Sequence, residues 1–143
     1  MSWPHDGTVT FDEALGLLQT LKVRLSRSLD PRLQEKPPEA MQVWFEPRPP
    51  VNPASNTVGL PLPILALVGD LTVTPQTLGW ATRHTPEELR RTVSLGGRVL
   101  VRIHCGYLID NRGRPFSASV DALTGVESLT LPGGVFESWF LIR

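Results

Sequence analysis

The stretch LVRIHCGYLIDNRGRPFSAS, Leu100 to Ser119, contains the turn that best indicates the fold. Asp110 and Gly113 stand at the first and last corners of a four-residue turn, where a type I turn prefers aspartate and glycine. In the register that places Ile109 opposite Arg114, the facing pairs on one side are apolar: Tyr107 with Phe116, Cys105 with Ala118, and Ile103 with Val120. A shift by one residue would turn serines toward the core. The stretch therefore predicts a hairpin with strands near 98–109 and 114–121.

The same register gathers polar side chains on the opposite face of the predicted hairpin. Arg102 is expected opposite Asp121, and His104 opposite Ser119. An opposite-charge pair across two strands stabilises a hairpin modestly. Arg102, His104, Ser119 and Asp121 are the candidate ligand-binding residues.

Cys105 is the only cysteine, and its neighbour His104 raises the question of a catalytic dyad. Side chains of adjacent strand residues leave opposite faces, so these two cannot meet. Cys105 belongs to the apolar row, where a thiol behaves as a small hydrophobic group. We expect a buried core thiol, and no catalytic residue is predicted.

Metal and cofactor motifs are missing from the sequence. His5, His84 and His104 are far apart in the chain and show no zinc-ligand spacing. No phosphate-binding loop, dinucleotide fingerprint or serine nucleophile elbow occurs. The carboxylates stand singly. The sequence predicts neither a metal nor a cofactor.

The N-terminal third begins with a helical pattern. Thr10 and Glu13 have capping-box spacing, and apolar residues then recur at helical intervals from Phe11 to Leu29. Asp30 precedes a proline, which disfavours the helical conformation. We predict an amphipathic helix over 11–29 that packs on a sheet of the same chain.

Residues 31–63 hold nine of the fourteen prolines. Proline cannot donate to a β-ladder, so an extended loop is expected around one short strand, 41–46. Trp44 and Phe45 should point to opposite faces of that strand. The segment EPRPPVNPASN (46–56) resembles a polyproline II ligand, although a stiff surface loop explains it more simply.

The remainder, 64–143, is expected to form a β-rich core. Further strands are predicted near 64–68, 71–74, 126–131 and 135–142, with Gly69 and Asp70 in a turn. Thr85, Pro86 and Glu88 predict the start of a short helix. The fold class is therefore α+β, mainly β: one domain, 1–143, with an antiparallel sheet or β-sandwich and the N-terminal helix packed on it.

Residues Gly106 to Pro115, followed by Ala118, resemble the opening hairpin of the carboxypeptidase-regulatory-like, prealbumin-type β-sandwiches. The resemblance implies a β-sandwich and carries no functional residue.

The composition of the chain limits the classes of partner that we expect for it. The 143 residues suit one domain, and 41% hydrophobic with 20% charged residues is typical of a soluble globular protein. The formal net charge is zero, which argues against nucleic acid and acidic membranes. The longest apolar run, Leu60 to Val68, is too short to span a bilayer. A single cysteine allows no internal disulfide, so we expect a cytoplasmic protein.

A winged-helix nucleic-acid binder is a minor alternative. It requires a helix over 76–82, a second helix from Pro86, and the strands of 98–121 as the wing. The zero net charge argues against it.

Two functional classes remain. The favoured one is a non-enzymatic interaction or accessory module that binds a protein partner or forms a homo-oligomer. Its expected contact surfaces are the loop 46–56, the side chains of Trp3 and Trp80, and a sheet edge. The alternative is an enzyme or small-ligand binder that uses the polar face around Arg102 and His104.

Overall fold

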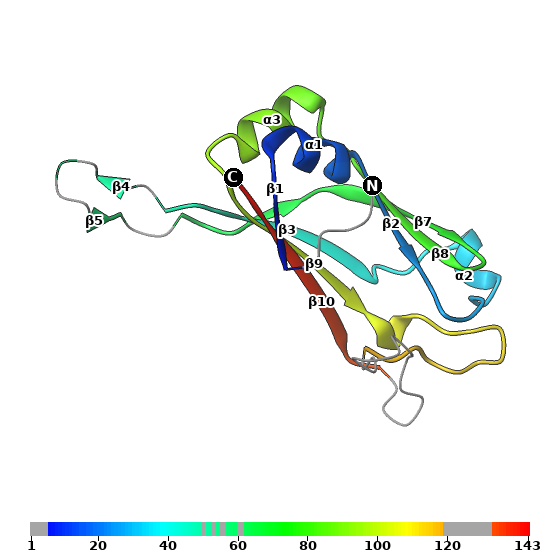
Figure 1. Cartoon of the computed structure of the whole chain (residues 1–143). Helices are drawn as coiled ribbons and strands as arrows, with labels where there is room; N and C mark the ends of the chain where they lie inside the picture. The colour runs from blue at the N-terminus through cyan, green and yellow to red at the C-terminus, as the bar shows by residue number, and fades with distance from the viewer. Residues whose placement is uncertain (1–5, 50, 53, 55–56, 60–61, 119–132) are drawn as a thin grey trace.

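The protein is an α+β structure dominated by two antiparallel sheets, seen in a computed structural model (Figure 1). The structure describes residues 6–49, 51–52, 54, 57–59, 62–118 and 133–143. The predicted strand 126–131 and the predicted contact residue Trp3 lie outside this part of the chain.

The larger sheet has the strand order β1-β10-β9-β3-β6. Its strands are β1 (Gly7–Val9), β3 (Met41–Pro47), β6 (Leu65–Leu67), β9 (Gly97–His104) and β10 (Val135–Ile142). Only β1 is parallel to its neighbour. The predicted strands 41–46, 64–68 and 135–142 are thereby confirmed, with small differences at their ends. Trp44 and Phe45 point to opposite faces as expected, since Phe45 is buried and Trp44 only partly so.

The smaller sheet has the order β2-β8-β7, from β2 (Thr20–Arg24), β7 (Gly69–Thr74) and β8 (Thr77–Thr82). The chain passes from the larger sheet to the smaller one at Val68, between β6 and β7. The predicted turn at Gly69 and Asp70 is therefore wrong, because both residues belong to β7. Gly69 is required there for another reason: a Cβ atom would lie 2.2 Å from Cε2 of the buried Trp80.

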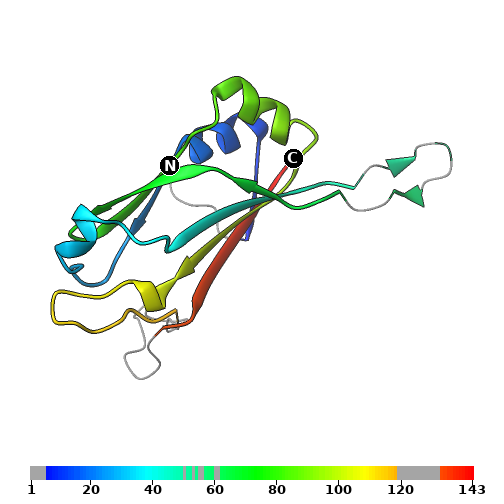
Figure 2. The same ribbon diagram turned by 180° about the vertical axis from the view of Figure 1, so that it is seen from behind.

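Helices close one end of the space between the sheets, as both views show (Figures 1 and 2). α1 (Phe11–Gln19) packs beside α3 (Pro86–Val93), and each begins with a complete capping box, at Thr10 and Thr85 respectively. α2 (Arg32–Glu35) is a single turn. The two-residue strands β4 (Val51–Asn52) and β5 (Thr57–Val58) pair with each other in an arm that projects from the two sheets (Figure 1).

The predicted helix 11–29 is only half correct. It ends at Gln19, and the chain continues as strand β2. Leu21, Val23 and Leu25 are spaced by two residues, so they fit the inner face of a strand as well as a helical stripe. Pairing with β8 decides between the two. The core thus lies between the sheets and under the helices, with Phe45 and Phe140 among its largest fully buried side chains.

The hairpin around Asp110 needs a larger correction. The turn is present, since the amide of Gly113 donates to the carbonyl of Asp110 at 3.0 Å and Gly113 has a φ of +80°. However, β9 ends at His104, and a 3₁₀ turn, η1 (Cys105–Tyr107), follows it. Ile109 then bridges to Pro115, one residue away from the predicted register, and the described part of 114–121 forms bridges rather than a strand.

The 3₁₀ turn is the physical reason for that shift. It breaks the period of two after Cys105, so Tyr107 is exposed and Leu108 takes its place in the core. Phe116 and Ser117 are both buried. The predicted hairpin paired this strand with residues 114–121. In the structure β9 pairs with β3 and β10 instead.

Candidate binding groove

The predicted polar face is only partly assembled. Arg102 and His104 lie on the outer face of the larger sheet, while Ser119 and Asp121 lie outside the described residues. Arg102 pairs with Gln42 and Glu137, while His104 pairs with Val135 and donates its amide to the carbonyl of Ala40. The predicted strand pairings of Arg102 with Asp121 and of His104 with Ser119 are therefore wrong.

Arg102 and His104 each have a polar neighbour on an adjacent strand. Nε of Arg102 lies 2.9 Å from Oε2 of Glu137, and Nε2 of His104 lies 3.3 Å from Oε1 of Gln42. The ring of Tyr107 lies 5.7 Å from that of His104. A surface hollow of about 400 Å³ borders His104. These groups form a cross-strand network, and they do not converge on one point as a catalytic site would.

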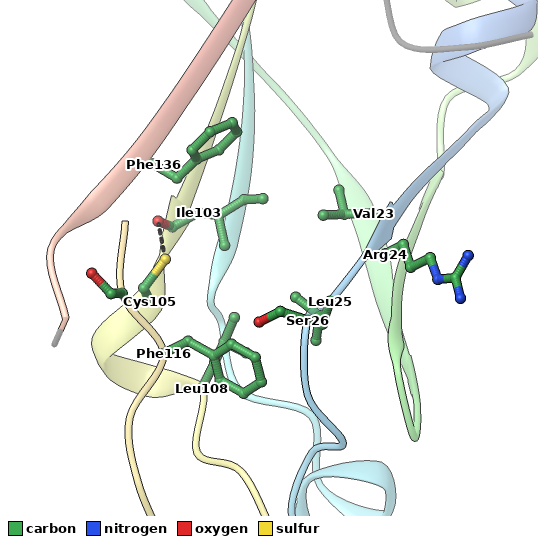
Figure 3. A pocket seen from close by; sticks show the side chains of 10 residues that line it. Val23, Arg24, Leu25, Ser26, Ile103, Cys105, Leu108, Phe116 and Phe136 are labelled. Carbon is green, nitrogen blue, oxygen red and sulfur yellow. Dashed lines mark hydrogen bonds between the residues drawn. The ribbon is translucent and has the colours of Figure 1, made fainter. Parts of the chain in front are cut away.

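A pair of adjoining hollows lies on the other face of the same sheet. Two adjoining cavities, of about 430 Å³ and about 250 Å³, follow the seam where β2 of the smaller sheet comes near β10 and β9 of the larger one. Figure 3 shows the larger of the two. Both cavities include Val23, Arg24, Ile103 and Phe136. We call this the seam groove; its remaining lining residues are Leu21, Lys22, Leu25, Ser26, Met41, Val101, Cys105, Leu108, Phe116, Ser117 and Ser138.

Strand alternation explains why the seam groove is apolar. Leu21 and Val23 turn inward from β2, whereas Val101, Ile103 and Phe136 turn inward from the larger sheet. Figure 3 shows Val23 and Leu25 on one side facing Ile103 and Phe136 on the other, with the Arg24 side chain directed away. Phe136 stays 36% exposed, although it lies on the inner face. The groove is an open apolar surface between two sheets.

An ion-pair cluster fixes the end of the groove where Phe116 lies. Asp110 is 1% exposed, and its carboxylate accepts the backbone amides of Arg112 and Arg114 at 2.9 and 2.8 Å. Arg27, just after β2, pairs with the same carboxylate. The Arg27 guanidinium also lies 4.4 Å from the centroid of the Phe116 ring. Burial raises the pKa of Asp110, but the donated hydrogen bonds outweigh it and lower the pKa to about 2.

Cys105 lies buried at the wall of the groove, and its burial is as the sequence predicted. Its thiol lies 3.7 Å from the carbonyl oxygen of Ile103, to which it donates. Trp80, expected as an exposed contact, is instead 3% exposed and belongs to the core. It points inward from β8, and that strand also replaces the helix 76–82 required by the winged-helix alternative.

The sequence held only part of the signal for this groove. The alternation of Leu21, Val23 and Leu25 is compatible with strand β2. These residues were assigned to the predicted helix 11–29, because their spacing also fits a helical stripe. Phe136 was recognised as part of an apolar strand, yet its exposure depends on how far the two sheets separate. Nothing local in the sequence encodes that separation.

Neither a membrane-spanning helix nor a metal-ligand cluster is found in the described part of the chain. No helix among the described residues is long and apolar enough to cross a membrane. Within the same residues, no group of three or more histidine, cysteine, aspartate or glutamate side chains is placed to hold a metal ion. Comparisons of the chain with protein-family models, with curated proteins and with solved structures found no match, so the resemblance to prealbumin-type sandwiches gains no support beyond the turn itself.

Proposed function

We propose that the chain is a non-enzymatic interaction module that binds an apolar segment of another protein in the seam groove. One observation carries this proposal: a continuous apolar hollow joins the two sheets and keeps the aromatic side chain of Phe136 partly exposed. Exposed apolar surface of this kind is typical of interaction sites. Besides the buried Cys105 thiol, the described residues that line the larger cavity include two hydroxyl groups, of Ser26 and Ser117, and Arg24, whose side chain is directed away from it.

The projecting arm is a second contact surface in this proposal. It contains the described residues of the Pro-rich segment 46–56, and after β5 the side chains of Leu62, Ile64 and Leu65 are exposed. A chain whose single cysteine can form no internal disulfide suits a cytoplasmic setting. A small apolar ligand would use the same groove, and the experiment below separates it from a peptide.

The test compares two substitutions on one strand. Phe136→Asp places a charge in the groove, whereas Leu141→Asp places the same charge on the outer face of β10, where Leu141 is 40% exposed. We expect a random peptide library displayed on phage to enrich binders on the wild-type protein and on Leu141→Asp. The same binders should lose at least tenfold in affinity for Phe136→Asp, since burying an unpaired charge against them is costly.

Other results would overturn the proposal. Enriched peptides that bind Phe136→Asp as tightly as the wild type would place the site elsewhere. If no peptide is enriched, but the apolar dye 1-anilinonaphthalene-8-sulfonate binds in a manner that Phe136→Asp abolishes, the groove is a small-ligand site instead.

A further inference from the structure

Among the residues that the structure describes, no strand pairs with the edge of β2 that faces away from β8, and this edge borders the seam groove. β2 is the terminal strand of its sheet, with β8 on one side. The amide of Leu25 donates to the carbonyl of Gln76, which continues the ladder between β2 and β8. In an antiparallel pair, alternate residues point their N–H and C=O groups toward the partner strand. Leu21 and Val23 therefore bond to β8, and the backbone groups of Lys22 and Arg24 point outward from the sheet.

The opposite border of the groove is partly occupied. The amide of Cys105 donates to the carbonyl of Gly134, so the same alternation leaves Val135, Glu137 and Trp139 with outward backbone groups on β10. The amide of Asp6 donates to the carbonyl of Trp139, and β1 pairs with the rest of that edge from Phe140 onward. Within the described part of the chain, β10 is therefore partly paired along this border, whereas β2 has no strand partner there.

The side chains on this edge are basic. Lys22 and Arg24 are exposed on the outer face of β2, and within the described residues neither forms an ion pair. The chain as a whole has no net charge, so these two residues make a local positive border. An additional strand would place every second residue beside them and the intervening residues over the apolar groove.

Self-association through this edge is disfavoured. Two copies of β2 paired antiparallel about Val23 would place Lys22 of one copy opposite Arg24 of the other. Like charges directly opposite across strands are destabilising. Lysine on an edge strand is also a common protection against indiscriminate pairing. The edge is suited to a partner of opposite charge.

We infer that the occupant of the seam groove is an extended acidic segment of another protein that adds to β2 as a further strand. This inference rests on the proposed function and specifies its ligand. Glutamate or aspartate at alternate positions faces Lys22 and Arg24, and apolar residues between them cover Val23, Ile103 and Phe136. The main-chain bonds to Lys22 and Arg24 supply affinity, while the charges and the groove supply specificity, as in other cases of strand addition.

The probe is a seven-residue peptide with alternating glutamate and valine, acetylated and amidated at its ends, and its control carries lysine in place of glutamate. We expect the glutamate peptide to bind the wild-type protein, measured by fluorescence anisotropy, and the lysine peptide to bind at least roughly tenfold more weakly. N-methylation at one set of alternate positions should abolish binding, and at the other set should have little effect. Equal affinities for the two peptides, or equal effects of the two methylation sets, would overturn the inference.

Substitutions in the protein separate main-chain from side-chain contributions. Lys22→Ala removes the charge alone, whereas Lys22→Pro also removes an outward N–H that β8 does not use, a change tolerated on edge strands. Lys22→Pro should therefore lower the affinity for the glutamate peptide clearly more than Lys22→Ala does. One further outcome separates the two proposals. If phage-selected peptides bind in a manner that requires Phe136, but the glutamate peptide does not bind, the proposed function stands and strand addition is refuted.

Discussion

Asp110 is the side chain on which the end of the seam groove depends. It is buried, accepts two backbone amides and pairs with Arg27 and Arg114. Because its folded pKa is about 2, below the ordinary value of 3.8, the carboxylate contributes stability above that ordinary value. This contribution is lost as the pH falls toward about 2.

Asp110→Asn should lower the melting temperature at neutral pH and flatten its acid dependence between about pH 4 and 2. The amide cannot replace the charge that faces Arg27 and Arg114. Thermal melts followed by circular dichroism at a series of pH values would measure both effects. The control is Asp70→Asn, since Asp70 pairs with Arg83 on the open surface and its loss should cost little. Equal losses in the two variants would contradict this role for Asp110.

Cys105 offers a second test at the scale of one residue. We expect Cys105→Ala to lower the free energy of unfolding by about 1 kcal/mol or somewhat more, because a small cavity remains. His104→Ala, next to it but on the outer face, should cost less. The native thiol should react slowly with a thiol reagent and rapidly after denaturation. Labelling of the native protein at the rate of free cysteine would show that the residue is not buried.

The sequence predicted these two residues unequally well. Burial of Cys105 followed from the apolar row Val99, Val101 and Ile103, all of which are buried. The turn at Asp110 followed from its preferred residues. The ion pair with Arg27 could not be foreseen, because Arg27 fell within the predicted helix 11–29, whereas α1 ends at Gln19.

At the scale of elements, two glycines have opposite roles. Gly16 is an exposed residue of α1 with no atom within 4 Å of its would-be Cβ, so Gly16→Ala should stabilise the fold by roughly 0.5–1 kcal/mol. Gly69→Ala should destabilise it, because the new methyl group would overlap the Trp80 ring. Urea unfolding of both variants measures the two signs. A stabilising Gly69→Ala would contradict the position of Trp80.

The capping boxes are a further test of the helices. Thr10→Ala and Thr85→Ala each remove a side chain that accepts the amide of the glutamate three residues on. Each should lower the free energy of unfolding by roughly 1 kcal/mol. The same urea experiment measures this loss, and Thr72→Ala in β7 serves as a comparison outside any helix cap. An unchanged midpoint in both cap variants would contradict the assigned helix starts.

Helix starts were predictable, but helix ends and strand partners were less so. A capping box is local, whereas the end of α1 depends on β8, which lies almost sixty residues later in the chain and pairs Trp80 with Leu21. For the same reason the partners of β9 were missed: the chain reverses at Asp110, yet β9 pairs with β10 and β3. Long-range pairing is not recorded in local patterns.

At the scale of the whole molecule, one domain over 1–143 stays a prediction. The two sheets share a core that includes Phe45 and Trp80, so we expect a single unfolding transition in urea. Far-ultraviolet circular dichroism and tryptophan fluorescence should give coincident curves. Two separate transitions would indicate that the smaller sheet unfolds independently.

The central claim concerns the open edge of β2 beside the seam groove. Amide hydrogen exchange, followed residue by residue with nuclear magnetic resonance, measures it directly in the free protein. The outward amides of Lys22 and Arg24 should exchange rapidly, while those of Val23 and Leu25, which face β8 and Gln76, should be protected. Addition of the alternating glutamate–valine peptide should then slow the hydrogen exchange of the Lys22 and Arg24 amides. If all four amides are protected in the free protein, the edge is already covered and the account is wrong.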